Sequence, residues 1–395
     1  MPPRPIRVLH VLPGVAPRYG GPSTVIRPMA ESLAQLPGVT VEIAATDADG
    51  PAGRLRPEDL PPSPVRVRLF PRTASEQWKI SLPLRRWLNA HAGEYDVLHV
   101  HALWSFATTA ACSAARRHCK PVILRPCGML SAYTWGRGAW KKRLYWNLVE
   151  RRNVATARAI HVTSPGEAED VARLGVVPAD RVFDIPLGLE PSSWEAAPNP
   201  APVRERFGGK ADGRPVVLYL SRLHPKKGVA DILLPAFARL KSDAVLAIAG
   251  APDERTPGYD AAIRETITRL GLSDRVRLLG PIAAADRWAV YDAADVFVLP
   301  SHSENFGVVV TEAMARGVPV VVTDAVQSCE HVTAAGAGKV VPVNPDAVAA
   351  ALDALLADPT GRKAAGDRGR AYVREHLGWD GIAKRIEAMY RTCLS

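Results

Sequence analysis

Short runs of apolar, β-branched residues alternate with longer amphipathic stretches along almost the whole chain. Each run spans only a few residues, as the strands of a parallel sheet do when helices cover both faces. In the first half of the chain the runs lie at 6–12, 39–45, 65–70, 95–100, 121–125, 159–163 and 182–185. This alternation is typical of βαβ units and predicts an α/β fold.

A second series of apolar runs lies at 215–219, 244–249, 276–279, 296–299, 318–322 and 340–343. The stretch between the first two has the period of a helix, with apolar residues at Val229, Ile232, Leu233, Ala236, Phe237 and Leu240. Pro235 within this stretch predicts a kink or a displaced helix start.

Two series of strands predict two Rossmann-like parallel-sheet domains facing a cleft, since 395 residues are too many for one ordinary core. The segment 189–213 is rich in Pro, Ala, Ser and Gly, and we expect it to link a domain at 1–188 to a domain at 214–378. The tail 379–395 has a helical pattern and no strand partner, so we expect it to pack back on the first domain.

The composition is that of a globular chain, with 47% hydrophobic and 23% charged residues. The first apolar stretch is interrupted by His10, Pro13 and Gly14, which favours a strand over a signal peptide and predicts a cytoplasmic protein. Five cysteines without C-x-x-C spacing argue against a zinc site and a disulfide framework. A net charge of +10 indicates an anionic partner, which could be nucleic acid, a phosphate-bearing substrate or a membrane leaflet.

A basic turn follows the first strand of the second series. Arg222 offers a planar fork for phosphate oxygens and Lys227 a compact point charge, a pair that suits a diphosphate. Ligands of open parallel sheets bind beyond the carboxyl ends of the strands, where this turn lies. The alternative is that both are solvated charges that cap a helix.

A polar loop follows the run at 296–299 and enters a helix near Gly307. Glu304 lies on the loop and Glu312 lies more than a turn into the helix, so the two carboxylates are not an acid–base pair that shares one proton. Backbone N–H groups at the helix start attract phosphate, and a carboxylate accepts hydrogen bonds from sugar or ribose hydroxyls.

Glu304 and Glu312, with seven residues and Phe306-Gly307 between them, resemble the E-x7-E signature of retaining GT-B glycosyltransferases of family 4. The segment 221–228 is similar to the family's G-R-L-x-x-x-K-G, with Ser221 in place of the usual Gly. The segments 18–23 and 96–101 resemble its glycine-rich loop and its D-x-x-H-x-H strand end. The matches follow the family's order over nearly the whole chain.

The resemblance implies a donor site held mainly by the C-terminal half. Glu304 would contact the transferred sugar, Glu312 the ribose, and Arg222 and Lys227 the diphosphate. The remaining implied donor-binding residues are Gly20, Gly21, Asn305, Phe306 and Gly307 near the phosphates and Gly280 and Ile282 beside the nucleobase. His101 would bond the sugar, whereas His99 is expected to face away from it and pack in the interior.

The activity implied is retaining transfer of a sugar from a GDP- or UDP-sugar to a glycan or polyprenyl-linked acceptor, without a cofactor or a metal. Fixed cations would stabilise the departing diphosphate. Asp47 and Asp49 match D-x-D, a metal-binding pattern of other glycosyltransferases, but lie in a loop where we expect no metal. The alternatives are a sugar-nucleotide epimerase or phosphorylase, an NAD-dependent oxidoreductase, for which the G-x-G-x-x-G turn is missing, and a basic nucleic-acid-binding protein.

Basic and aromatic residues interleave in the segment 135–152. This pattern suits an anionic membrane surface or stacked nucleic-acid bases. We favour the membrane, because many family members act on lipid-linked acceptors, and this would place the protein at the inner membrane face. The alternative is a helix whose aromatic side chains pack inward and whose charges are solvated.

Overall fold

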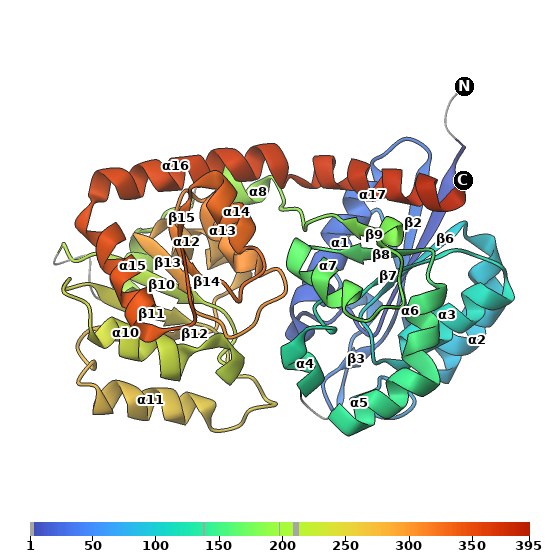
Figure 1. Ribbon diagram of the computed structural model, residues 1–395, viewed down its shortest axis with the longest axis horizontal. Coiled ribbons are helices and arrows are strands. Elements are labelled where there is room, and N and C mark those ends of the chain that lie inside the picture. Colours follow the sequence, from blue (N-terminus) through green and yellow to red (C-terminus); the bar gives the residue numbers. More distant parts are fainter. Residues whose placement is uncertain (1–3, 137–138, 197, 208–212) are drawn as a thin grey trace. The chain divides into compact units, whose positions relative to one another are not determined.

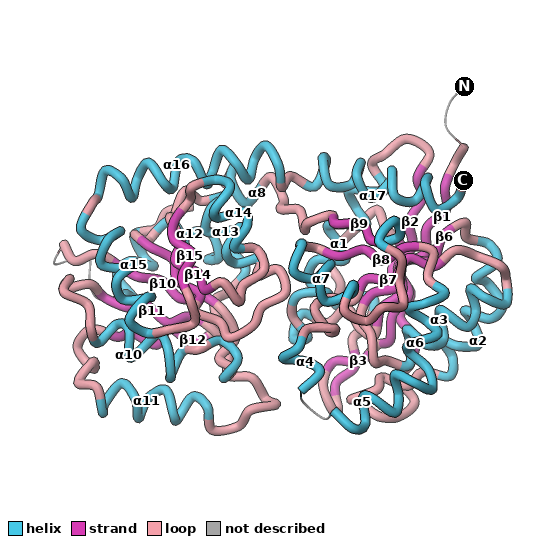
Figure 2. The backbone as a smooth tube through the Cα atoms, viewed as in Figure 1, coloured by secondary structure: helices cyan, strands magenta, loops and turns pink. Residues whose placement is uncertain are grey.

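The computed structural model describes residues 4–136, 139–196, 198–207 and 213–395. The chain divides into two compact units, the first formed by Met1–Gly188 with Trp379–Ser395 and the second by Leu189–Gly378. In each unit the strands form a central sheet between helices (Figures 1 and 2). The predicted α/β fold with two parallel sheets is therefore confirmed.

The first unit contains a seven-stranded parallel sheet in the order β5-β2-β1-β6-β7-β8-β9. Its strands are β1 (Ile6–Leu12), β2 (Val39–Thr46), β5 (Arg66–Phe70), β6 (Val97–His101), β7 (Val122–Arg125), β8 (Ala159–Val162) and β9 (Val182–Asp184), and a small hairpin pairs β3 (Ala48–Asp49) with β4 (Gly53–Arg54). Its helices are α1 (Gly21–Ala34), α2 (Leu82–His91), α3 (Phe106–Arg117), α4 (Ala132–Gly136), α5 (Ala139–Tyr145), α6 (Arg151–Thr156), α7 (Pro165–Ala172) and α17 (Trp379–Leu394).

The second unit contains a six-stranded parallel sheet in the order β12-β11-β10-β13-β14-β15. Its strands are β10 (Val216–Leu220), β11 (Val245–Ala249), β12 (Val276–Gly280), β13 (Val296–Leu299), β14 (Val320–Thr323) and β15 (Gly338–Val341). Its helices are α8 (Ser192–Glu195), α9 (Ala201–Phe207), α10 (Leu234–Ala238), α11 (Tyr259–Arg269), α12 (Arg287–Asp292), α13 (Val308–Ala315), α14 (Cys329–Ala335), α15 (Pro345–Ala357) and α16 (Pro359–His376).

Every predicted apolar run forms a strand, with ends that shift by a few residues at most. The helix predicted between the first two strands of the second unit begins with a π-helical turn at Val229–Leu233 and continues as α10. Pro235 is the second residue of α10 and directly follows the π-helical turn, so the helix changes its winding at the proline while its helical start stays at Val229.

The segment 189–213, which we expected to be a linker between the domains, contains secondary structure. Its described part contains α8 and α9 and belongs to the second unit, where Val203 and Phe207 lie in the hydrophobic core. Residues 197 and 208–212 lie outside the described residues. The tail forms α17, which packs against α1 of the first unit.

Both sheets have one point where the strand order reverses. In the second unit β10 lies between β11 and β13, and in the first unit β1 lies between β2 and β6. Loops that leave two such neighbouring strands diverge to opposite faces of the sheet, and the crevice between them is where open α/β sheets bind ligands. Most of the predicted functional residues lie at or after the ends of β10, β13, β1 and β6, whereas Gly280 and Ile282 lie at or just after the end of the edge strand β12.

Candidate active site

Lys227 and Glu304 meet at the switch point of the second unit. Lys227 lies in the turn after β10, Glu304 lies in the loop after β13, and the lysine Nζ donates to the carboxylate Oε2 in a close ion pair. Their side chains are 11% and 19% exposed, so the pair is largely shielded from water without being sealed off from a ligand. The predicted convergence of these two loops is therefore present within one unit.

The backbone holds these two loops against each other. Gly228 has a φ of 70°, and a Cβ there would lie 2.2 Å from the carbonyl oxygen of Pro300 at the end of β13. The His302 N–H donates to the Lys226 carbonyl at 2.8 Å. Any residue larger than glycine at 228 would push the basic turn away from the polar loop.

The carboxyl group of Glu304 is kept ionised. Burial opposes its ionisation, but the Lys227 ammonium, aided by Lys226 and Arg222, outweighs burial and holds the pKa of Glu304 below its usual value. An ionised carboxylate only accepts hydrogen bonds, so Glu304 is suited to bind hydroxyls and not to deliver a proton.

Glu312 has different partners. In helix α13 its carboxylate accepts hydrogen bonds from the Arg287 guanidinium at 2.6–3.1 Å and from the Tyr291 hydroxyl at 2.6 Å. These partners lie four residues apart on α12, on one face of the helix. The two glutamates therefore belong to separate hydrogen-bond networks, as their spacing in the sequence predicts.

Arg222 is bonded to an acidic residue that sequence reasoning missed. Its Nη1 donates to Asp253 at 2.7 Å, and Arg255 binds the same carboxylate at 2.6–3.0 Å. The bonds from Arg255, opposed by burial, lower the pKa of Asp253. Arg222 remains 42% exposed, and its charge is one of those that lower the pKa of Glu304.

The other predicted donor-site residues of the second unit lie near the ends of β12 and β13. Gly307 has a φ of 69° and caps α13, where a Cβ would lie 3.1 Å from Glu304 Cγ. Phe306 is buried against the His331 ring, with 5.6 Å between centroids. The remaining residues are Asn305 in the same loop, Gly280 with a φ of 70° at the end of β12, and the half-buried Ile282 just beyond it.

In the first unit, Gly20, Gly21 and His101 flank the switch point. Gly20 has a φ of 75° and precedes the first residue of α1, Gly21, and open space surrounds the position of a Cβ at Gly21. The N-terminus of α1 thus offers backbone N–H groups beside the end of β1. His101 is the last residue of the neighbouring strand β6.

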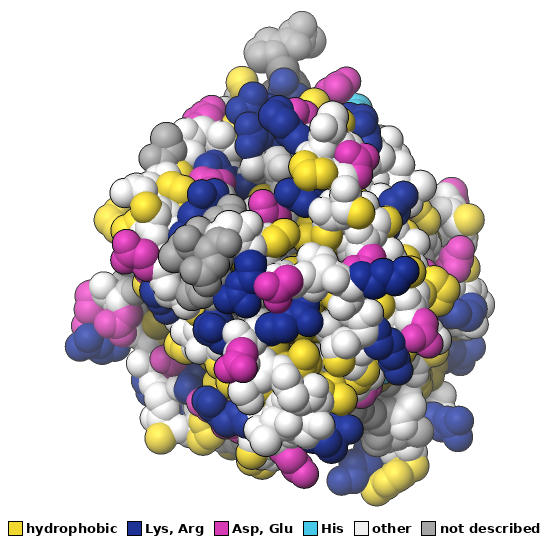
Figure 3. All heavy atoms as spheres, turned by 90° about the vertical axis from the view of Figure 1, so that its left-hand side faces the viewer, with side chains coloured by type: hydrophobic (Ala, Val, Ile, Leu, Met, Phe, Trp, Pro, Cys, Tyr) yellow, Lys and Arg dark blue, Asp and Glu magenta, His cyan; other side chains and the backbone are white. Residues whose placement is uncertain are grey.

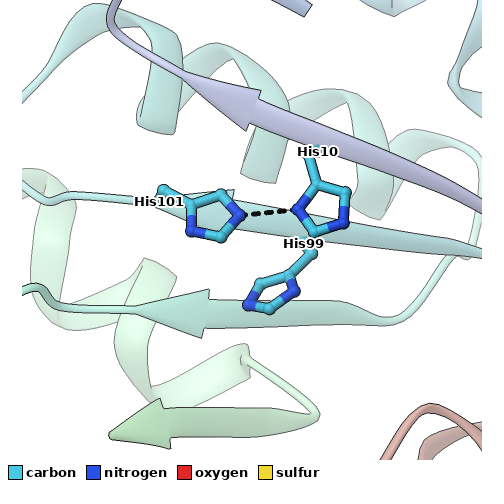
Figure 4. A group of neighbouring side chains, drawn as sticks. All are labelled: His10, His99 and His101. Atoms are coloured by element: carbon cyan, nitrogen blue, oxygen red, sulfur yellow. Dashed lines mark hydrogen bonds between the residues drawn. The ribbon is translucent and has the colours of Figure 1, made fainter. Parts of the chain in front are cut away.

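The expectation that His99 faces away from His101 is wrong. Side chains two residues apart on a strand point to the same face, and the two rings stack with centroids 4.3 Å apart. His10 on β1 joins them, and its Nδ1 lies 2.8 Å from His101 Nε2 (Figure 4). His99 does pack in the interior, as we expected, but beside His101.

These histidines belong to a longer chain of hydrogen bonds. His99 Nδ1 lies 2.8 Å from the hydroxyl of Tyr390 on α17, and that hydroxyl lies 3.5 Å from His10 Nε2. His161 on β8 lies with its Nδ1 3.3 Å from His99 Nε2 and its Nε2 2.9 Å from the Ile185 carbonyl. We call this set (His161, His99, Tyr390, His10, His101) the histidine relay.

Every member of the relay except Tyr390 is a neutral imidazole at neutral pH. Burial, with a further contribution from the Arg125 charge, lowers the pKa of His10 and His161 to about 3 and also lowers the pKa of His99 and His101. A neutral imidazole has one N–H donor and one acceptor nitrogen, so a fixed partner at one end determines the tautomer of every ring.

The fixed partner is the Ile185 carbonyl, which can only accept. His161 therefore donates from Nε2, His99 donates from Nε2 to His161, and the Tyr390 hydroxyl donates to His99 Nδ1. The hydroxyl oxygen accepts from His10 Nε2, and His10 Nδ1 accepts from His101 Nε2. His101 is left with Nδ1 as an acceptor, and this buried nitrogen has no partner among the described residues.

The ligand atoms of His10, His99 and His101 lie within 4.8 Å of one another, a spacing that suits a metal ion. The relay uses the nitrogens that would have to bind such an ion, and the Arg125 charge acts on the same rings. The D-x-D acids are also engaged, since Asp47 accepts from the Arg72 backbone N–H at 2.7 Å and Asp49 lies 3.6 Å from Arg18.

Comparison with known proteins identifies the family. Residues 20–188 match the glycosyl transferase 4-like domain and residues 204–372 match the glycosyl transferases group 1. The D-inositol 3-phosphate glycosyltransferase of Xylanimonas cellulosilytica is 30% identical over 91% of this chain and 85% of that protein. The chain belongs to the group 1, family 4-like glycosyltransferases. This family assignment confirms the resemblance found in the sequence and identifies the chain as a glycosyltransferase that uses a nucleoside-diphosphate sugar.

Two further comparisons give the extent of the likeness. The enzyme of the same name from Kineococcus radiotolerans is 33% identical to this glycosyltransferase over 60% of the chain, and the match spans only 57% of that protein. The structure of HepE from Anabaena with UDP and glucose has a TM-score of 0.79 at 22% identity and covers 98% of this chain and all of that one. At 22% identity, the likeness to HepE shows a shared fold.

Sequence reasoning missed several residues of this glycosyltransferase that hold the site. Asp253, Arg287, Tyr291 and Tyr390 lie on other elements than the residues they orient, and the sequence does not reveal these pairings. The i, i+4 spacing of Arg287 and Tyr291 was the one signal in the sequence, because it places both side chains on the same face of a helix. Among the described helices none is both long and apolar enough to cross a bilayer.

Proposed function

We propose that this glycosyltransferase transfers a hexose from a UDP- or GDP-sugar to a glycan or lipid-linked acceptor with retention of configuration and without a metal ion. The observation that carries the proposal is the Lys227–Glu304 ion pair at the switch point of the second unit. In this pair the Lys227 ammonium would bind the diphosphate, and the ionised Glu304 carboxylate would accept hydrogen bonds from sugar hydroxyls.

The charges suit the bond that must break. Cleavage of the sugar–diphosphate bond gives the sugar oxocarbenium character and adds negative charge to the leaving diphosphate. Lys227 and Arg222 would stabilise that charge more in the transition state than in the ground state. Gly307 at the start of α13 would add backbone N–H groups, and Glu312 would bind the ribose.

Retention would follow from attack on the face that the diphosphate leaves, because the departing phosphate can take the proton of the incoming hydroxyl. The ionised Glu304 would hold sugar hydroxyls, and the free Nδ1 of His101 would accept one further hydroxyl hydrogen bond. No side chain then needs to act as a nucleophile, which distinguishes this reaction from a double displacement.

The donor is proposed by analogy. Anabaena HepE has been crystallised with UDP-glucose, and this supports a UDP-hexose as the first donor to test here. Release of nucleoside diphosphate that depends on an acceptor would distinguish a glycosyltransferase from a phosphorylase or an epimerase on the same fold. On the face drawn in Figure 3, Lys and Arg side chains are scattered among acidic and apolar ones, which does not favour a nucleic-acid-binding stripe there.

The acceptor is proposed to reside at an anionic membrane. Trp140, Leu144 and Leu148 follow each other at i, i+4 and i+8 along α5 and the π-helical turn at Trp146–Glu150, and they are 68%, 55% and 71% exposed. The exposed basic residues closest to this stripe in the sequence are Lys141, Arg143, Arg151 and Arg152. An apolar stripe among cations suits the headgroup region of an anionic leaflet.

We propose that the two interpretations of segment 135–152 apply to different side chains. Trp135, Tyr145 and Trp146 pack inward against Trp104, with ring centroids 5.3–6.1 Å apart, whereas the stripe faces outward. Residues 137 and 138 lie outside the described residues. The inward rings would hold the helix rigidly while the stripe contacts lipid.

Acceptor-dependent release of UDP or GDP from the corresponding sugar nucleotides tests the function, with EDTA added to test for a metal requirement. Lys227→Ala should lower kcat by roughly two to three orders of magnitude, the scale for removing one electrostatic stabiliser. Lys241→Ala, a change at an exposed lysine of the same unit, is the matched control and should leave kcat unchanged. Equal turnover of the two variants, or release that needs no acceptor, would contradict the proposal.

A further inference from the structure

Arg125 is a buried cation at the carboxyl edge of the first sheet. It is the last residue of β7 and pairs in register with His101 on β6. Leu124 pairs with Ile160 on β8, so the next step of that register places Arg125 opposite His161. It is only 2% exposed and ranks among the largest fully buried side chains of the protein. The guanidinium therefore lies on the sheet face that carries the histidine relay.

The guanidinium has no anionic partner among the described residues. Its Nε and Nη1 atoms are buried and form no hydrogen bond there. Glu167 on α7, a buried carboxylate of the same unit, is already occupied. Its Oε1 accepts from Gly128 N–H at 2.5 Å and its Oε2 accepts from the N–H and hydroxyl of Thr163 at 2.9 and 3.0 Å.

An unpaired buried charge is expensive, because a charge removed from water is stabilised only by a partner or by further hydrogen bonds. The described residues around Arg125 do not supply that partner, since the histidines beside it are neutral. Arginine also keeps its charge when buried, so it cannot relieve the cost by losing a proton. The free N–H groups therefore call for an anion.

We propose that Arg125 forms a binding site for a phosphate-class oxyanion at the switch point of the first unit. Its fork would bind two oxygens of the anion in a bidentate manner. The free Nδ1 of His101 lies beside it as an acceptor, so a phosphate ester that also carries a hydroxyl would satisfy both groups. A metal cation does not suit the same place, because the guanidinium repels it and the relay occupies the ring nitrogens.

The site is independent of the donor chemistry in the second unit, but its use for an acceptor rests on the proposed function. Binding of the anion alone therefore tests the site, and glycosyl transfer tests the function. A failure of one leaves the other to be judged by its own measurement.

The test is thermal unfolding of the full chain in chloride buffer and in 10 mM inorganic phosphate at equal ionic strength. Wild-type protein should gain about 3–5 °C in the Tm of the first unit, the shift expected for millimolar affinity in a unit of roughly 200 residues. Arg125→Met should lose this gain, and in chloride its Tm should lie above that of the wild type because an unpaired charge is gone. Arg86→Gln, which removes an exposed charge of the same unit, should keep the gain.

Phosphate can also bind the basic turn of the second unit, so the same measurement is made in a Lys227→Ala background, where the Arg125-dependent gain should persist. A second arm replaces inorganic phosphate with glycerol 3-phosphate. A gain from both ligands indicates that the group can be part of an acceptor, and a gain from inorganic phosphate alone indicates a bound ion. Equal phosphate-induced rises in Tm for the wild type and Arg125→Met would contradict the site. The site would also be contradicted if Arg125→Met had a lower Tm than the wild type in chloride and still showed the full rise in phosphate.

Discussion

The proton arrangement of His101 is set by residues far from it in the sequence. A carbonyl at Ile185 fixes the tautomer of His161, and the Tyr390 hydroxyl passes this constraint on to His10 and then to His101. Burial prevents these rings from gaining a second proton at neutral pH. A D-x-x-H-x-H pattern identifies His101 but not its partners, because they come from β1, β8 and the C-terminal helix.

Tyr390→Phe tests the relay. Without the hydroxyl, no hydrogen bond among the described residues links His99 to His10, so the acceptor state of His101 Nδ1 is no longer enforced. We expect kcat to fall about tenfold, as for the loss of a group that orients an active-site imidazole, while the KM of the donor stays unchanged. The measurement is steady-state release of nucleoside diphosphate by the wild type and the variant, at a temperature where both proteins are folded.

The control for that substitution is Tyr145→Phe, which removes a hydroxyl bonded to Thr109 at 2.7 Å in the same unit but outside the relay. It should leave kcat unchanged. An equal fall in kcat for the two tyrosine variants would mean that general packing, and not the relay, accounts for the loss.

At the scale of elements, close backbone contacts bring the functional loops together. Gly228 and Gly307 have positive φ angles where a Cβ would meet Pro300 and Glu304, and these positions set the distance between the turn after β10 and the loop after β13. Hydrophobic periodicity was sufficient to locate the strands, because each is a short apolar run and the inner strands of both sheets are buried on both faces. It could not reveal that the described part of segment 189–213 contains the short helices α8 and α9 and joins the second core, since only Val203 and Phe207 of α9 are buried there.

The helix α5 gives a prediction at the same scale. Leu144→Glu with Leu148→Glu should weaken binding to vesicles that contain anionic phospholipid at least tenfold, because two apolar contacts are lost and two negative charges face the leaflet. Co-sedimentation with vesicles of increasing anionic content measures the effect. Leu82→Glu, at another exposed leucine of the first unit, is the control and should bind as the wild type does. Equal binding by all three proteins would remove the membrane role of α5.

For the whole molecule, the C-terminal helix completes a unit that begins with the first strand. Trp379, Ile382, Ile386 and Met389 of α17 are buried in the first unit, and Tyr390 reaches the relay from the same helix. The sequence pattern predicts two sheets and a tail that packs on the first unit, because each apolar run marks one strand and the apolar face of the tail has to be buried. The buried polar row of the first sheet could not be predicted, because strand order decides which histidines become neighbours.

That row makes the first unit sensitive to acid. The pKa of His10 and of His161 is about 3 in the folded protein, against about 6.5 in the unfolded chain, and those of His99 and His101 are also lowered. Below pH 6.5 the unfolded chain binds protons that the folded protein does not, so the free energy of unfolding falls as the pH falls towards 3. The slope is about 1.4 kcal/mol per pH unit for each such histidine.

Urea unfolding between pH 7.5 and 4.5, followed by tryptophan fluorescence, measures this slope. His161→Gln removes one titrating ring, and its stability should therefore depend on pH less steeply than that of the wild type by about one proton, even if the substitution lowers stability at pH 7.5. The change in slope, and not the absolute stability, separates burial of neutral histidines from ordinary loss of packing. An unchanged slope would show that His161 is already protonated in the folded protein, and the tautomer order deduced for the relay would then be lost.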